Sequence, residues 1–152
     1  MDTEISKIKK ILLVEDDSRD LELTLAGLEE NHLANKVAVA RDGAEALDYL
    51  FATGAHAGRD ASVVPQLVLL DLGLPRVGGL DVLKRIRGDE RTRLVPVVVL
   101  TSSKEEEDVV KSYSLGANGY VRKPVEFPAL SDVVRALGLF WLLVNEIAPP
   151  RS

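Results

Sequence analysis

The chain has 152 residues, 46% of them hydrophobic and 28% charged, which predicts one globular domain with a sizeable core. Its net charge of −5 argues against a dedicated nucleic-acid binder, and the lack of cysteine excludes disulfides and thiolate metal sites. Because no signal region follows Met1 and no apolar run is long enough to cross a bilayer, we expect a cytoplasmic protein that does not enter the membrane.

The first half of the chain predicts two strands and two helices after a polar, flexible arm at residues 1–9. Residues 11–14 form an apolar run typical of a buried strand. The helix that follows, to about residue 30, has Asp17 or Ser18 as its N-cap. A second, shorter strand at residues 36–40 leads into a second helix.

The second half repeats this alternation three times after a long loop. Residues 52–66 show no periodicity, and a loop of this length usually serves function or mobility, so its role stays open. Buried strands are predicted at residues 67–70, 96–100 and 119–122, each followed by a helix. Five strand–helix pairs predict an α/β fold, a doubly wound five-stranded parallel sheet of flavodoxin-like size.

Two of the later helices carry particular expectations. Ser103 to Glu106 has the spacing of a capping box, and Val109, Val110 and Tyr113 are expected on the apolar face of the helix that it opens. The last helix, from about residue 128 to 144, has apolar residues beyond one stripe, namely Leu139, Phe140, Leu142 and Leu143. We expect these four to form a homodimer surface, with a broad core face as the alternative.

Polar residues follow the predicted strands at their carboxyl ends. Glu15 and Asp16 follow the first strand, Asp71 the third, Thr101 the fourth and Lys123 the fifth. In a parallel sheet these ends share one edge, where ligands bind. Neighbouring carboxylates need a cation, and oxygen ligands favour Mg²⁺. Beside such an ion a carboxylate can attack a phosphoryl group, whose oxygens a lysine and a hydroxyl can hold.

Simpler interpretations stay open for several polar residues. Asp17 is better explained as a helix N-cap than as a metal ligand. Glu15 and Asp16 are also compatible with a solvated turn, although two acids at the end of a buried strand fit a metal site better. His32 and His56 fall in predicted loops without other ligand types at useful spacing, and neither is expected to bind metal or to catalyse.

Four segments, each ending a predicted strand, resemble the receiver domain of two-component response regulators. They are Leu13–Asp17, Leu69–Pro75, Val99–Ser102 and Tyr120–Pro124. The likeness covers about residues 10–140 and implies a single receiver domain at 10–148 without an output domain. The 52–66 loop and the ending at 138–146 also resemble single-domain regulators that partner cyanobacterial and bacterial phytochrome histidine kinases.

The resemblance implies an acceptor and a metal site. Asp71 would accept the phosphoryl group from a sensor histidine kinase. Asp16, Asp71 and the backbone carbonyl of Gly73 would bind Mg²⁺ directly, and Glu15 would act mainly through a metal-bound water. Since Gly73 has no side chain at a position that often carries one, the resemblance leaves the rate of dephosphorylation open.

The resemblance also implies a switch. Thr101 and Lys123 would hold the phosphoryl oxygens, and Tyr120 would turn inward when Thr101 moves to the phosphate. The bond between Lys123 and Pro124 is expected to be cis. The protein would then be a signalling component that phosphorylates itself from a donor and slowly removes the group, and its output would pass through protein contacts.

Three other functions are weighed against this one. A receiver-like adaptor or dimerisation module would not need phosphorylation, but the acidic pair, Asp71, Thr101 and Lys123 are all present. A phosphohydrolase with an aspartate nucleophile would need a second aspartate where Gly73 stands. Flavin or nucleotide binding has no Gly-rich phosphate loop to support it.

Overall fold

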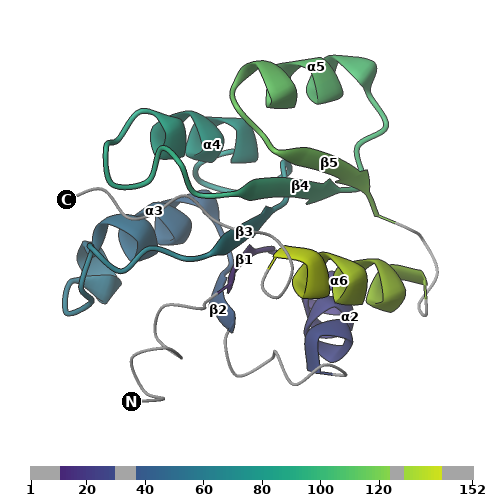
Figure 1. The fold of residues 1–152 in the computed structure, drawn as a ribbon, viewed down its shortest axis with the longest axis horizontal. Coiled ribbons are helices and arrows are strands. Elements are labelled where there is room, and N and C mark those ends of the chain that lie inside the picture. The colour runs from purple at the N-terminus through teal and green to yellow at the C-terminus, as the bar shows by residue number, and fades with distance from the viewer. Residues whose placement is uncertain (1–10, 30–36, 124–128, 142–152) are drawn as a thin grey trace.

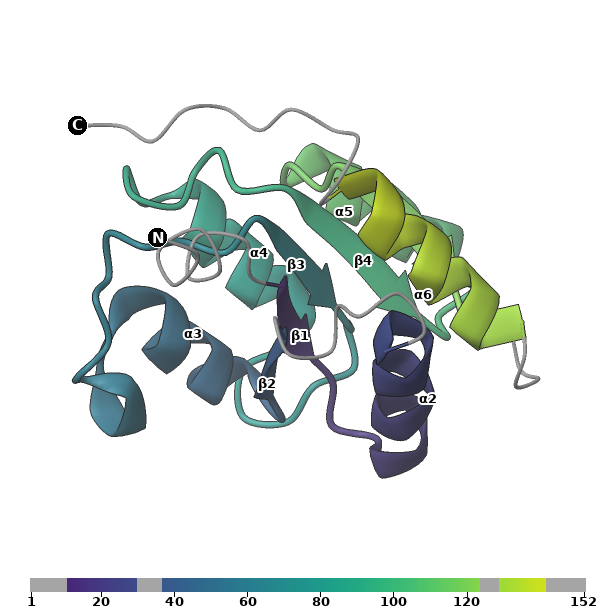
Figure 2. The same ribbon diagram turned by 60° about the horizontal axis from the view of Figure 1, so that its bottom comes forward.

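A computed structural model describes residues 11–29, 37–123 and 129–141 of the chain. In these ranges five parallel strands form one sheet in the order β2-β1-β3-β4-β5, with helices on both faces (Figures 1 and 2). The strands are β1 (Ile11–Val14), β2 (Val37–Ala40), β3 (Leu67–Leu70), β4 (Val97–Thr101) and β5 (Gly119–Arg122). The helices are α2 (Ser18–Glu29), α3 (Gly43–Phe51), α4 (Gly79–Arg87), α5 (Glu106–Ser114) and α6 (Ala129–Leu139), with a short 3₁₀ helix η2 (Gly54–His56). The predicted doubly wound sheet is confirmed.

The sheet is buried between two helical layers. Leu12 and Val14 of β1 enter the layer of α3 and α4, whereas Ile11 and Leu13 enter the layer of α2 and α6, which lie side by side (Figure 2). Strands covered on both faces need apolar residues at every position, which explains their continuous apolar runs. β1 and β3 pair in parallel with Val14 beside Leu70, so both strands end at the same level.

Helix α5 differs from its prediction in its start and in its face. It begins at Glu106, and Ser103 does not cap it in a box, because the Ser103 hydroxyl donates to Asp108 Oδ2 at 2.6 Å. Val110 is 64% exposed and Tyr113 51% exposed, so the predicted apolar core face is wrong for these two residues, whereas Val109 is partly buried. The reason is the position of α5 at the β5 edge, where of its residues only Ser112 is buried (Figure 1).

Helix α6 matches its predicted core face as far as it is described. Leu130 and Val134 are fully buried against α2 and the sheet, and Leu137 and Trp141 pack partly against the same cluster. The regular helix ends at Leu139 and a wider π-helical turn follows at Phe140 and Trp141, whereas the rest of the expected extension, to residue 144, lies outside the described residues, as does the arm at 1–9. None of the helices in the described ranges is long and apolar enough to span a membrane.

The loop at residues 52–66 is organised by Arg59. Its guanidinium donates to the carbonyls of Tyr49 and Val63, both at 2.7 Å, and to that of Leu50 at 3.3 Å. The same group lies 4.2 Å from the centre of the Tyr49 ring. Arg59 thereby satisfies carbonyls at the carboxyl end of α3 that the helix leaves unpaired, and it ties the loop to that helix.

Candidate functional site

Four strands bring polar side chains to one edge of the sheet. Glu15 directly follows β1, Asp71 follows β3, Thr101 ends β4 and Lys123 follows β5. The backbone N–H of Lys123 donates to the Thr101 carbonyl at 2.8 Å, which continues the pairing of β4 with β5 beyond the last strand residue. Residues that are far apart in the sequence therefore meet at the carboxyl edge of the sheet, as the order of the strands requires.

The carboxylate of Asp71 is held from two sides. The Thr101 hydroxyl donates to Asp71 Oδ1 at 2.8 Å, and the Lys123 ammonium donates to Asp71 Oδ2 at 2.9 Å. The backbone N–H of Gly73 gives Oδ1 a weaker bond at 3.3 Å. Both oxygens of Asp71 thus have donors, which fixes the orientation of a carboxylate that is nearly buried.

Lys123 contacts two further carboxylates. Its ammonium also donates to Glu15 Oε1 and, at 2.9 Å, to Asp20 Oδ2 in the first turn of α2. The Lys123 side chain is only 5% exposed, so these ion pairs lie in a largely desolvated place. Asp20 did not emerge from the sequence, because an acid in the first turn of a helix is already explained by the helix dipole.

The charges perturb one another strongly. Burial raises the pKa of Glu15 from 4.5 to about 7, against the opposing effect of its bond from Lys123. Burial also acts to raise the pKa of Asp71, but the bonds from Lys123 and Thr101 outweigh it and hold that pKa below its usual value. Burial lowers and the three carboxylates raise the pKa of Lys123, and the net direction is upward. Near neutral pH, Asp71 is therefore an ionised acceptor beside a charged lysine.

Glu15, Asp16 and Asp71 form a cluster that fits a cation. One carboxylate oxygen from each lies within 4.8 Å of those of the other two. Within the described residues these three line or adjoin a cavity of about 710 Å³, to which Gly73 and Thr101 also contribute. Oxygen donors alone, with an excess of negative charge over the single lysine, suit a hard divalent ion such as Mg²⁺.

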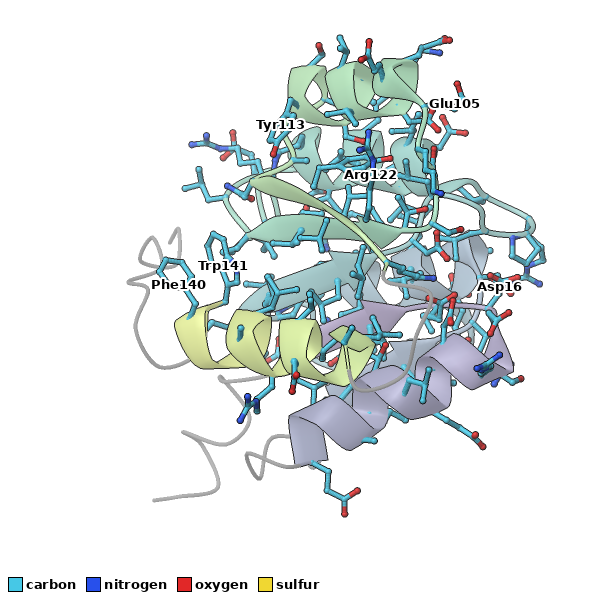
Figure 3. All side chains as sticks on the ribbon, turned by 90° about the vertical axis from the view of Figure 1, so that its right-hand side faces the viewer. Asp16, Glu105, Tyr113, Arg122, Phe140 and Trp141 are labelled. Carbon is cyan, nitrogen blue, oxygen red and sulfur yellow. The ribbon has the colours of Figure 1, made fainter. Side chains whose placement is uncertain are left out.

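Local contacts hold the acidic segment between β1 and α2 in place. The Arg41 guanidinium donates to the Asp16 carbonyl at 3.2 Å and to the Ser18 hydroxyl at 2.8 Å. Asp17 Oδ1 accepts from the backbone N–H of Asp20 at 2.9 Å, which is the N-cap contact that the sequence predicted for it. Asp17 is thus occupied as a cap, and Asp16 points away from the core at the carboxyl edge (Figure 3).

The two glycines near Asp71 differ in the space that a side chain would have. A Cβ on Gly79 would lie 2.3 Å from the Asp71 carbonyl oxygen, so only glycine permits this approach of α4 to the end of β3. A Cβ on Gly73 would meet nothing within 4 Å. The missing side chain at Gly73 therefore leaves open space beside Asp71, as the sequence suggested.

Tyr120 lies next to the segment that follows Thr101. Its half-buried hydroxyl donates to the Ser103 carbonyl at 3.3 Å, a bond that joins β5 to the loop after β4. The role of Tyr120 as a switch stays a prediction. Pro124, and with it the expected cis bond, lies outside the described residues.

Of the expected dimer residues, the structure describes the side chain of Phe140, which lies at the other end of the molecule from the acidic cluster. Phe140 is 48% exposed and packs edge-to-face on Trp141, with ring centres 5.2 Å apart. Figure 3 shows both rings at the end opposite Asp16. Leu142 and Leu143 lie outside the described residues, and Leu139 is described by its backbone alone.

Of the two histidines, only His56 lies in a described part of the chain. Its Nε2 lies 3.5 Å from Glu45 Oε2, and its ring packs edge-to-face on Tyr49. It therefore belongs to the 52–66 loop and its support by α3, and it does not contribute to the acidic cluster.

Comparisons with known proteins agree with this geometry. A family model described as the response regulator receiver domain matches residues 11–135. The response regulator Rcp1 of Synechocystis is 37% identical over 142 residues, which are 93% of this chain and 95% of Rcp1. Its Mn²⁺-bound crystal structure aligns with a TM-score of 0.84 at 35% identity, covering 93% of this chain and 99% of that one.

Two other solved structures extend the likeness. The phosphorylated cyanobacterial phytochrome response regulator RcpA aligns with a TM-score of 0.86 at 37% identity, over 93% of this chain and 99% of that one. The bacteriophytochrome response regulator AtBRR is 55% identical and aligns with a TM-score of 0.71, over 91% of this chain and 99% of that one.

Proposed function

This chain belongs to the response regulator receiver family, whose members act in phosphorylation-dependent signalling, and we propose that Asp71 is its phosphoryl acceptor. The observation that carries the proposal is the Asp71 carboxylate, ionised and held between the Thr101 hydroxyl and the Lys123 ammonium. Either oxygen can act as the nucleophile, and the two donors are placed to receive the charge of an arriving phosphoryl group.

Glu15, Asp16 and Asp71, with the backbone carbonyl of Gly73, would hold Mg²⁺. The ion, when bound, supplies positive charge that neutralises phosphoryl oxygens and lets the anionic acceptor and donor approach. The close grouping of the three carboxylates supports this assignment, as does the relative Rcp1, whose structure has been solved with Mn²⁺.

The transfer is a simple displacement at phosphorus. A carboxylate oxygen of Asp71 forms the new O–P bond, and the P–N bond to a kinase phosphohistidine breaks. The leaving ring nitrogen keeps the bonding electrons, and because the other ring nitrogen carries a proton, the histidine leaves as neutral imidazole. Lys123 and Thr101 donate hydrogen bonds to phosphoryl oxygens in the transition state and afterwards. Water later cleaves the phosphoryl group from Asp71 and restores the carboxylate, which makes the signal reversible.

The partner is a sensor histidine kinase, and the likeness to phytochrome response regulators favours a kinase of the phytochrome type. The phosphoryl group carries about −1.5 to −2 charges, by analogy with other phosphorylated side chains, in place of the single charge of the Asp71 carboxylate, and it attracts Thr101 and Lys123. Movement of Thr101 would alter the bond between Tyr120 and Ser103 and so the surface that other proteins contact. A receiver unit at residues 10–148 and a cytoplasmic location stay predictions from the sequence.

Intact-mass analysis after incubation with acetyl phosphate tests the acceptor. We expect a gain of one phosphoryl group, about 80 Da, that requires Mg²⁺ and is absent in Asp71→Asn. Beryllofluoride, a mimic of the bound group, should bind the wild type under the same conditions. If neither adduct forms in the wild type, the receiver proposal fails and the adaptor function takes its place.

A homodimer through the end of α6 is proposed on separate grounds. Phe140 exposes an aromatic ring beside Trp141, and aromatic residues are enriched in protein interfaces. Sedimentation velocity of the wild type, with and without beryllofluoride, should show a dimer that Phe140→Ser weakens at least tenfold. The exposed Tyr113→Ser on α5 is the matched control. A wild type that stays monomeric in both states would disprove the dimer.

A further inference from the structure

Asp16 is the carboxylate of the proposed metal site that has the least support from its own contacts. The Glu15 carboxylate accepts from Lys123 and from the backbone N–H of Asp17. Both oxygens of Asp71 have donors as well. In the described ranges the Asp16 carboxylate accepts no hydrogen bond, and Asp16 is the least buried of the three acids. Its oxygens are therefore free for a cation, but they do not fix the position of the side chain.

Arg41, which directly follows β2, holds the backbone of Asp16 instead. Its Nη2 donates to the Asp16 carbonyl at 3.2 Å and to the Ser18 hydroxyl at 2.8 Å. One guanidinium nitrogen thereby joins Asp16 to the start of α2. Among the residues that the structure describes, this is the one hydrogen bond that Asp16 makes, so the position of Asp16 depends on Arg41.

The backbone that carries Arg41 is itself well fixed. The Arg41 N–H donates to Glu45 Oε1 at 3.0 Å, and Asp42 Oδ1 accepts from the Glu45 N–H at 2.7 Å, so two bonds tie this turn to the first turn of α3. The next residue, Gly43, lies so close to the loop after β3 that a Cβ would collide with the Val77 carbonyl. The turn between β2 and α3 is therefore a rigid base from which the guanidinium can hold Asp16.

We propose that Arg41 is a positioning residue for the divalent ion, an inference that rests on the metal site of the proposed function. It holds the backbone of Asp16 so that the carboxylate lies near those of Glu15 and Asp71, within 4.8 Å between oxygens, before the ion binds. Order that exists beforehand removes part of the entropy cost of binding and raises the affinity. The positive charge of Arg41 has the opposite effect on a cation, so a test has to keep that charge constant.

The test compares Arg41→Lys with Arg19→Lys by titration with Mn²⁺, followed by the EPR signal of the free ion. Both variants keep the positive charge, and both side chains are exposed. Lysine ends one bond short of Nη2 and lacks the planar guanidinium, so Arg41→Lys loses the contact with the Asp16 carbonyl. Arg19, next to Ser18 on α2, is the control. We expect Arg41→Lys to raise the Kd for Mn²⁺ about fivefold and Arg19→Lys to change it less than about twofold.

A double-mutant cycle shows whether Arg41 acts through Asp16. Asp16→Ala keeps the backbone carbonyl that Arg41 binds but removes the carboxylate, so Mn²⁺ should bind this variant more weakly, through Glu15 and Asp71. In this background Arg41→Lys should change the Kd for Mn²⁺ by less than about 1.5-fold. Equal weakening with and without the Asp16 carboxylate would overturn the inference, because Arg41 would then act through the fold or through its charge.

Phosphorylation by acetyl phosphate separates this inference from the function on which it rests. Arg41→Lys should need about fivefold more Mg²⁺ for its half-maximal rate but should reach the wild-type rate in saturating Mg²⁺. A lower rate at saturation, or an Arg41→Lys variant that binds Mn²⁺ as well as Arg19→Lys does, overturns the role of Arg41 and leaves the acceptor in place. A wild type that binds no Mn²⁺ and accepts no phosphate overturns the proposed function and this inference together.

Discussion

Replacing Glu15 with glutamine should stabilise the metal-free protein at pH 8 and leave its stability almost unchanged near pH 5. The folded protein raises the pKa of Glu15 from 4.5 to about 7, chiefly through burial. Between these values the folded state keeps a proton that the unfolded state has lost, so stability falls as the pH rises from about 5 to 7. Above both values the loss is complete.

The magnitude follows from the same pKa values. A rise from 4.5 to 7 corresponds to about 3 kcal/mol at pH 8, and E15Q removes this loss because its amide is neutral. The amide has only one acceptor oxygen, whereas Glu15 accepts from both Lys123 and the backbone N–H of Asp17. Losing one of these bonds costs about 1 kcal/mol, which leaves a net gain of about 2 kcal/mol.

Urea unfolding in EDTA at several pH values between 5 and 8 measures this gain. Glu22→Gln, on the exposed side of α2, is the control and should follow the wild type at every pH. Asp71 does not interfere, because its lowered pKa confines its own loss of stability to more acidic pH. A difference between E15Q and the wild type that stays constant across this range would refute the reasoning, since burial of an ionised Glu15 would then cost nothing.

Three further predictions concern the support of the site, each measured by urea unfolding. Arg59→Ala removes three bonds to backbone carbonyls and the contact with the Tyr49 ring, and should lower the free energy of unfolding by about 2–3 kcal/mol. A loss below about 0.5 kcal/mol would show that the 52–66 loop does not depend on Arg59. Gly79→Ala forces a Cβ against the Asp71 carbonyl and should lower the free energy of unfolding by about 2 kcal/mol or more, whereas Gly73→Ala enters open space and should be nearly neutral. Equal effects of the two variants would contradict the close approach of α4 to the end of β3. Asp17→Ala should cost about 1 kcal/mol through the lost N-cap and Asp17→Asn only a few tenths, and the reverse order would exclude the cap.

The fold was largely predictable because its strands are apolar at every position. The run from Leu67 to Leu70 is bounded by Pro65 and Gly73, and the structure gives a strand with the predicted ends. The face of α5 was not predictable in this way. Val110 and Tyr113 follow a helical pattern, but a pattern does not say whether a neighbouring element covers it, and at the β5 edge nothing in the described residues covers these two.

The site was predictable only as far as strand ends determine it. Asp71, Thr101 and Lys123 come together because parallel strands share an edge, and that rule needs no side-chain detail. Asp20 contacts Lys123, 103 residues away, and Arg59 contacts the Tyr49 carbonyl on α3, each through one long basic side chain. Such contacts leave no period in the sequence, so only coordinates could reveal them.

The pairing of β1 with β3 makes the site depend on the number of residues in these two strands. Val14 lies beside Leu70, so Glu15 and Asp71 leave the sheet as neighbours. One residue inserted within either strand would turn every later side chain to the opposite face and would separate the two acids. An insertion in residues 52–66, which enter β3 from its other end, leaves that count unchanged. The loops that enter the strands at their amino ends can therefore vary in length. At the carboxyl ends, the number of residues between each paired strand and its site residue must stay the same.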